Sequence, residues 1–245
     1  MTPHRPSTHD TDDRSDMDER AIRRAAAAGD VPALIAATDG VRIDPGLQLV
    51  GYVAVGLWRA ADPDRRALLE PLLARLRDEL GRRAGAGDGL LAAELAALLT
   101  GQEPAGTQLP IDLEDFVTGL HLSFDGEIGA LLDPRTGETV PAAIAYGDDA
   151  GYRDEEHDEE YDVDDWLLIV DDANDWHDLA AFVDTLPQDS DIRHRLARAI
   201  QGRGAFRRFN DIVHEADLYR RWAAFRDDRQ WGRARELLDE HGLRP

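Results

Sequence analysis

Residues 202–225 read GRGAFRRFNDIVHEADLYRRWAAF, and this stretch organises the C-terminal part of the chain. Its two glycines favour a break in the backbone, because glycine adopts conformations that other residues avoid. After the break, apolar residues recur every three or four positions, which is the spacing of one helix face. The stretch therefore predicts two amphipathic helices. The residues expected in their core are Phe206, Phe209, Val213, Leu218, Trp222 and Phe225.

A basic run leads into this stretch, since residues 193–208 contain six arginines and no carboxylate. The planar guanidinium of arginine carries several hydrogen-bond donors that match carboxylate and phosphate groups. At a helix N-terminus, unpaired backbone N–H groups and the helix dipole add to this attraction. We therefore predict a binding site for an acidic partner or a small anion. Its candidate residues are Arg203, Arg207, Arg208 and Arg221.

The segment before the basic run is strongly acidic: residues 148–191 contain 18 acidic residues and one arginine. One alternative is that these carboxylates pair with the arginines of residues 193–208. Within the segment, residues 148–165 indicate an exposed acidic loop, and residues 154–165 read DEEHDEEYDVDD. Because oxygen ligands suit Ca²⁺ or Mg²⁺, the alternative function is a carboxylate-dependent or metal-assisted hydrolase. The spacing differs from that of a calcium-binding loop, so we expect no metal and no cofactor.

The composition limits the possible partners. The chain has 245 residues, of which 42% are hydrophobic, and 28 basic against 50 acidic residues give a net charge of -22. Such a charge opposes binding to nucleic acid or to an anionic membrane. There is no cysteine, which excludes disulfides, thiolate zinc sites and cysteine nucleophiles. No apolar run is long enough to span a bilayer, so we expect a cytoplasmic protein with no membrane partner.

The N-terminal half shows a helical pattern. Residues 1–18 are polar and acidic, and we predict a disordered tail. Residues 19–99 predict an all-helical domain, in which Asp30 caps a helix and leucines at helical spacing mark a longer helix over residues 63–80. No repeat recurs at a fixed period, which favours a helical bundle over a solenoid. Residues 100–110, TGQEPAGTQLP, predict a linker.

Residues 111–245 predict a second domain of α+β character. A short helix over residues 111–122 precedes a hairpin whose strands lie within residues 127–132 and 138–144, and WLLIV at residues 166–170 predicts a buried strand. Helices are expected over residues 176–186, 192–200, 205–214 and 229–241, and another helix around Trp222. The predicted fold is thus a helical N-terminal bundle followed by a small antiparallel sheet that packs with a C-terminal helical cluster.

The phrases LLDPRTGETV, WLLIV, GRGAFRRFNDIV and LYRRWAAFRDDR give the C-terminal part a family resemblance. Over roughly residues 111–243, the chain resembles uncharacterised protein family 0158, which is found in bacteria. The resemblance implies a helix, a hairpin, a strand and then a cluster of helices, and it implies no activity. At position 210 this chain has asparagine where that family often has lysine. The signature positions that the chain matches are Gly202, Gly204, Phe206, Arg208, Phe209, Trp222 and Phe225.

Sequence motifs of catalysis are missing from the chain. It contains neither a G-x-S-x-G nucleophile elbow nor an H-E-x-x-H zinc motif, and residues 202–204 do not form a phosphate-binding loop. We therefore predict a non-catalytic binding or interaction module that uses the arginine-rich residues 193–208.

Overall fold

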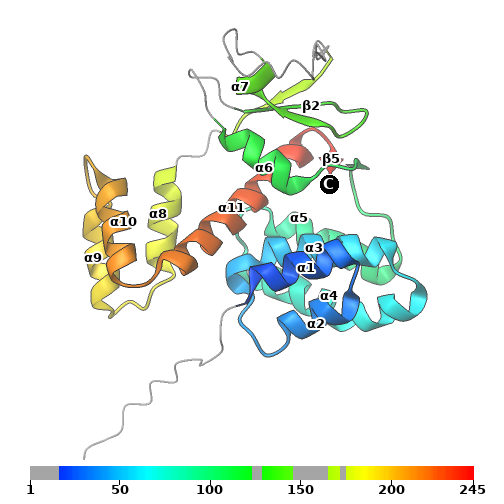
Figure 1. The fold of residues 1–245 in the computed structure, drawn as a ribbon, viewed down its shortest axis with the longest axis horizontal. Helices are drawn as coiled ribbons and strands as arrows, with labels where there is room; N and C mark the ends of the chain where they lie inside the picture. The colour runs from blue at the N-terminus through cyan, green and yellow to red at the C-terminus, as the bar shows by residue number, and fades with distance from the viewer. Residues whose placement is uncertain (1–16, 123–128, 146–164, 172–174) are drawn as a thin grey trace, which may run out of the picture.

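The N-terminal part of the protein is a bundle of helices (Figure 1). The computed structural model describes residues 17–122, 129–145, 165–171 and 175–245; most of the predicted tail (1–18) and acidic loop (148–165) lies outside these ranges. The bundle consists of α1 Glu19–Ala28, α2 Val31–Thr38, the 3-10 turn η1 Asp44–Gly46, α3 Leu47–Ala60, α4 Pro63–Arg83 and α5 Asp88–Thr100.

Local sequence signals account for the ends and faces of these helices. The Asp30 carboxylate accepts a hydrogen bond from the backbone N–H of Ala33 at 3.0 Å, which confirms the predicted cap of α2. Along α4, the predicted leucine stripe is buried from Leu69 to Leu80. Leu68 was expected to belong to this stripe, but it is 54% exposed. The stripe follows positions 69, 72, 73, 76 and 80, so residue 68 lies beside it and not within it.

A small three-stranded antiparallel sheet follows α6 Leu113–His121. The predicted hairpin is confirmed as β2 Ala130–Leu132 and β3 Thr139–Pro141, but residues 142–144, which were expected in its second strand, belong to a helix. The predicted strand WLLIV contains β4 Leu167–Ile169. It was expected to be buried, whereas only Ile169 is buried and Leu168 is 49% exposed, because one face of this edge strand is uncovered. Strand β2 is central, pairing Leu131 with Val140 of β3 and with Leu168 of β4. The short helix α7 Ala142–Ala145 follows β3, and α6 packs against both β2 and β3. The fold is therefore α+β and dominated by helices.

Four helices complete the chain: α8 Asp175–Asp184, α9 Asp191–Ala199, α10 Ala205–Glu215 and α11 Tyr219–Glu240. The sequence pattern predicts separate helices around Trp222 and over residues 229–241, whereas the structure has one helix of 22 residues. No proline interrupts this segment, and its one glycine, Gly232, has a helical conformation. After α11, β5 Leu243–Arg244 pairs in parallel with β1 Thr107–Gln108, a strand inside the predicted linker 100–110.

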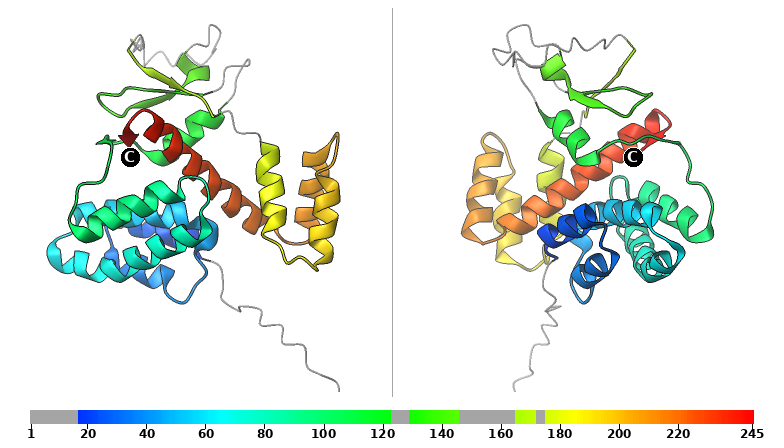
Figure 2. Two further views of the ribbon diagram at one scale, coloured as in Figure 1. Left: turned by 180° about the vertical axis from the view of Figure 1, so that it is seen from behind. Right: turned by 45° about the vertical axis from the view of Figure 1, so that its right-hand side comes forward.

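Helix α11 connects two hydrophobic cores, and Figure 2 shows it running from α8–α10 towards α6 and the N-terminal helices. The larger core joins the N-terminal helices, Leu109 of the segment 100–110, α6, the sheet, and the second half of α11 through Trp231 and Leu238. The smaller core joins α8, α9, α10 and the first half of α11. In it, the ring of Trp222 meets Phe182 and Phe209 edge-on, with ring centroids 5.2 Å and 5.0 Å apart.

Two glycines allow α11 to approach the N-terminal bundle closely. A Cβ atom on Gly232 would lie 2.0 Å from the carbonyl oxygen of Ala86, and one on Gly87 would lie 2.3 Å from that of Gly232. Gly87 also has a φ of 68°, which favours glycine. The second half of α11 therefore rests directly on the loop that precedes α5.

None of the helices within the described ranges combines the length and apolar composition that crossing a bilayer requires.

Candidate functional site

The predicted arginine site lies at the junction between α9 and α10. The Ser190 hydroxyl caps α9 by accepting a hydrogen bond from the Arg193 N–H at 3.1 Å. Between the helices, Gly202 and Gly204 have φ values of 72° and 75°, so both take the left-handed conformation that the predicted break requires. Gly204 directly precedes α10, and no side chain caps the first turn of this helix.

Arg208 stabilises the junction itself. Its Nε and Nη2 donate to the carbonyl oxygen of Ala199 at 3.2 Å and 2.9 Å. Its Nη2 and Nη1 also donate to the carbonyl oxygens of Gln201 and Arg203, both at 2.6 Å. Because the last carbonyl groups of a helix have no partner within the helix, Arg208 satisfies the C-terminal end of α9. The guanidinium of this predicted binding residue is thus hydrogen-bonded to nearby backbone carbonyl oxygens.

Three other arginines of the run have partners within the protein. Arg193 donates to Asp184 at 2.7 Å and to nearby carbonyl oxygens, Arg195 pairs with Glu215, and Arg198 donates to the carbonyl oxygen of its own helix one turn back. Within the part of the chain that the structure describes, Arg193 is the one member of residues 193–208 that pairs with the acidic segment 148–191. Within the described ranges, the arginines of residues 193–208 therefore form few ion pairs with the acidic segment 148–191.

Arginines of α11 form more ion pairs with the described part of the acidic segment than the arginines of residues 193–208 do. Arg229 donates to Asp178 at 2.7 Å, and Arg233 donates to Asp178 and Asp171 at 3.0 Å. Asp178 is buried, and these bonds join α8 to α11.

Arg203 and Arg207 differ from the other arginines of the run. Both are exposed, and neither side chain has a hydrogen bond or ion pair with any described residue. In particular, no ion pair forms between Arg207 and Asp211, one turn later on α10. Phe206 lies between the two arginines in sequence and is 46% exposed, whereas the pattern predicted it in the core. The buried stripe of α10 is formed by Ala205, Phe209 and Val213, which leaves Phe206 at its edge.

We call Arg203, Phe206 and Arg207 the arginine tip. A second exposed aromatic residue lies at the same end of the helical cluster, because the indole N–H of Trp176 donates to the carbonyl oxygen of Ile200 at 3.0 Å. Trp176 belongs to the first turn of α8 and is 38% exposed. Figure 1 shows the start of α8 and the α9–α10 junction at the same end of the cluster.

Arg221, the fourth predicted binding residue, lies elsewhere. Its Nη2 donates to the carbonyl oxygen and the hydroxyl of Thr185 at 3.2 Å and 3.3 Å, and its guanidinium lies over the Phe182 ring at 5.9 Å. Thr185 follows the last residue of α8, so Arg221 is near the opposite end of this helix from Trp176. Arg203 and Arg207 both lie at the α9–α10 junction, four residues apart, whereas Arg221 lies apart from them on α11.

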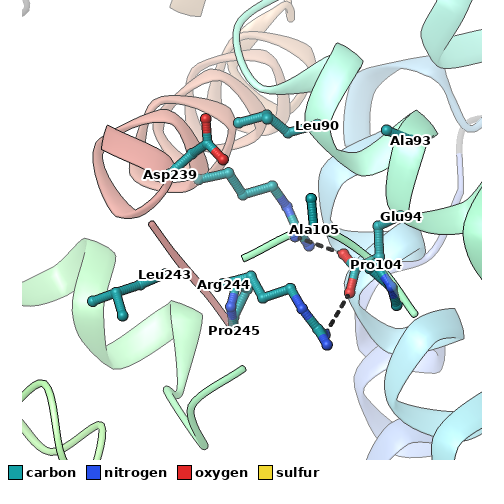
Figure 3. Close-up of a pocket in the computed structure, with 10 residues that line it drawn as sticks. Leu90, Ala93, Glu94, Pro104, Ala105, Asp239, Leu243, Arg244 and Pro245 are labelled. Carbon is teal, nitrogen blue, oxygen red and sulfur yellow. Dashed lines mark hydrogen bonds and ion pairs between the residues drawn. The ribbon is translucent and has the colours of Figure 1, made fainter. Parts of the chain in front are cut away.

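Sequence reasoning missed a second group of charged residues, which is buried where α3, α5 and α11 meet. Its centre is Glu94, whose carboxylate accepts hydrogen bonds from Arg59 at 2.5 Å and from Arg235 at 3.3 Å. Arg244 of β5 lies 3.8 Å from the same carboxylate. A cavity of about 90 Å³ adjoins this group (Figure 3).

A neighbouring buried cluster links α11 to α4 and α5. Arg83 binds Asp88 at 2.5 Å and Asp228 at 2.6 Å, and Gln48 donates its backbone N–H to Asp228 and its side-chain amide to Asp88. Burial raises the pKa of Asp228 to about 6, although Arg83 opposes this rise. Burial also acts to raise the pKa of Asp88, but hydrogen bonds and charge from Arg83 outweigh it, so that the pKa is lowered.

The alternative metal site of residues 154–165 lies outside the described residues except for Asp165. Across the described ranges, no group of three or more histidine, aspartate or glutamate side chains is arranged to hold a metal ion.

Comparison of the chain with protein-family models, with curated proteins and with solved structures finds no match. The resemblance to uncharacterised protein family 0158 therefore stays a prediction.

Proposed function

We propose that this protein is a cytoplasmic, non-catalytic binding protein that recognises an acidic segment of a partner protein through the arginine tip. The observation that carries the proposal is that Arg203 and Arg207 are exposed and without a partner in the described structure, while the other arginines of residues 193–208 are engaged. Two such guanidinium groups offer paired hydrogen bonds to carboxylates.

The exposed aromatic residue between the arginines supports a protein partner over a small anion. Arginine and aromatic residues are enriched at the centres of protein interfaces, where a few of them contribute most of the binding energy. Phe206 adds apolar area beside the two charges, and Trp176 extends this area at the same end of the cluster. A small anion would use the charges alone. The net charge of -22 weighs against nucleic acid as the partner.

A labelled peptide of alternating glutamate and leucine residues provides a direct probe. Fluorescence anisotropy measures its affinity for the full chain and for the double variant Arg203→Glu with Arg207→Glu. Hydrogen bonds to charged groups contribute roughly 1.5–3 kcal/mol each. Loss of both arginines should therefore raise the dissociation constant of the peptide at least about tenfold. Phe206→Ala should weaken binding as well, because it removes the apolar contact.

The matched control is the double variant Arg24→Glu with Arg220→Glu, which changes the net charge equally at two other exposed arginines. It should bind the peptide almost as the unchanged protein does. Equal weakening by both double variants would show attraction to overall charge and would refute the arginine tip as the site. Inorganic phosphate that displaces the peptide at equal ionic strength, with Phe206→Ala without effect, would instead indicate a small-anion site.

A further inference from the structure

The cavity beside Glu94 is bounded by α5, the second half of α11 and the C-terminal segment. Leu90, Ala93 and Leu243 form apolar walls, and Arg235, Asp239 and Arg244 add charged groups. Its volume of about 90 Å³ is far below the roughly 300–1,000 Å³ of pockets for drug-sized ligands. The cavity is nevertheless large enough for more than one water molecule. Its occupant must therefore be small.

Arg235 directs hydrogen-bond donors towards this cavity. The residue is only 5% exposed, and its guanidinium has five N–H groups. Nε donates to Gln48 at 2.9 Å and Nη1 to Glu94 at 3.3 Å, while Nη2 has no hydrogen bond to a described residue. No fully buried side-chain nitrogen in the described structure lacks a partner, so Nη2 contacts open space, and the cavity is the space that Arg235 lines. These donors suit an anionic group.

The negative charge of the Glu94 carboxylate does not remove the preference of the cavity for an anionic group. Three arginine side chains, Arg59, Arg235 and Arg244, surround it. Arg59 also donates to the carbonyl oxygen of Pro245 at 3.1 Å, and Arg244 also donates to Gly106 and Gln108, so Arg235 is the arginine that leaves a nitrogen for the cavity. Glu103, the other carboxylate bound to Arg244, has a side chain that is 83% exposed. Burial acts to lower the pKa of Arg235, as expected for a guanidinium that lacks full compensation.

Asp239 provides the opposite charge at the outer side of the cavity. It lies four residues after Arg235 on α11, hence on the same helix face, and it is exposed. Its side chain has no hydrogen bond or ion pair with the residues that the structure describes. In Figure 3, Asp239 lies beside Leu90 and well apart from Arg244. A ligand with a positive group at this end and a negative group near the arginines would match both.

We propose that this cavity binds a short aliphatic zwitterion, with its carboxylate at Arg235, its methylene groups against Leu90 and Leu243, and its ammonium group at Asp239. This site is independent of the arginine tip, which lies on the smaller helical cluster. Because the ligand has few atoms, we expect a dissociation constant near about 1 mM.

The test is isothermal titration calorimetry of the full chain with 4-aminobutyrate, butyrate and butylamine at constant ionic strength. These three probes share a four-carbon chain and differ in their charged ends. We expect saturable binding of 4-aminobutyrate at one site, roughly tenfold weaker binding of butyrate, and no saturable binding of butylamine, because it lacks the carboxylate that Arg235 binds.

Three variants connect the binding to the cavity. Asp239→Asn should lower the affinity for 4-aminobutyrate about tenfold, to the level of butyrate, and Ala93→Phe should abolish binding by filling the cavity. Ala93 and Asp239 are both exposed, so neither change should unfold the protein. The matched control Glu240→Gln, on the next residue of α11, should leave binding unchanged. Absence of saturable 4-aminobutyrate binding, equal affinity for butyrate, or binding that survives Ala93→Phe would each overturn the proposal.

Discussion

Asp228 should make the stability of this protein depend on pH. Its side chain is 4% exposed, accepts a hydrogen bond from the Gln48 N–H at 2.8 Å and pairs with Arg83 at 2.6 Å. Arg83 is shared with Asp88, so two carboxylates compete for one guanidinium. Burial therefore dominates for Asp228 and raises its pKa from 3.8 to about 6. Replacement by asparagine removes the titration and nearly preserves the shape.

The sign follows from proton binding in the two states. Between pH 3.8 and about 6, the folded protein holds a proton on Asp228 that the unfolded chain has lost. This extra bound proton stabilises the folded protein; the stabilisation is complete below pH 3.8 and is lost as the pH rises through 6. Roughly two pKa units at about 1.4 kcal/mol each give a total of about 3 kcal/mol. About 1 kcal/mol of this loss should fall between pH 5 and pH 7.

Urea unfolding followed by tryptophan fluorescence measures this effect. The free energy of unfolding of the unchanged protein minus that of Asp228→Asn should decrease by about 1 kcal/mol from pH 5 to pH 7. Asp211 on α10 supplies the control: it is exposed and has no hydrogen bond or ion pair with a described residue, so Asp211→Asn should show no such change over this range. A difference for Asp228→Asn that stays constant, or that increases with pH, would refute the reasoning.

The remaining predictions use the same unfolding measurement. Trp222→Ala should lower the free energy of unfolding by about 3–5 kcal/mol, because it empties the centre of the smaller core. Phe206→Ala should change it by no more than about 0.5 kcal/mol, because Phe206 is exposed; similar losses for both variants would contradict this difference in burial. Arg208→Ala should lower the free energy of unfolding by about 1 kcal/mol, since the C-terminal carbonyls of α9 lose a hydrogen-bond donor. Arg207→Ala should leave the free energy of unfolding nearly unchanged; a larger loss for Arg207→Ala than for Arg208→Ala would contradict the contacts described for the two residues. Gly232→Ala should cost about 2 kcal/mol, because the new Cβ would meet a backbone oxygen of the loop before α5. A stabilised Gly232→Ala variant would show that α11 does not approach this loop closely.

Much of the local structure could be predicted from the sequence, because local signals determine it. The Asp30 cap, the left-handed glycines 202 and 204 and the hairpin around residues 133–137 each depend on a few neighbouring residues. The continuity of α11 was missed, although the absence of proline from residues 219–240 indicated it. Charged residues follow Phe225, but such residues do not end a helix in the way that proline does.

The long-range arrangement could not be predicted in this way. Gln48 bonds to Arg235 and Asp228, which are 187 and 180 residues away, and strands of two residues such as β1 and β5 have no measurable periodicity. One signal was present for Arg235. It follows Trp231 by four residues and precedes Leu238 by three, so it stands on the buried face of α11.

The arginine tip was predicted in part. The run of residues 193–208 indicated where exposed arginines lie, but its six members are equivalent by composition. Only the positions of their partners, such as Asp184 for Arg193 and the α9 carbonyls for Arg208, separate the engaged arginines from Arg203 and Arg207.

The affinity ratio between the two double charge-reversal variants tests the central claim most directly. With the glutamate–leucine peptide, Arg203→Glu with Arg207→Glu should bind at least about tenfold more weakly than Arg24→Glu with Arg220→Glu. A ratio near one, with both variants folded, would contradict the assignment of acidic-partner recognition to the arginine tip.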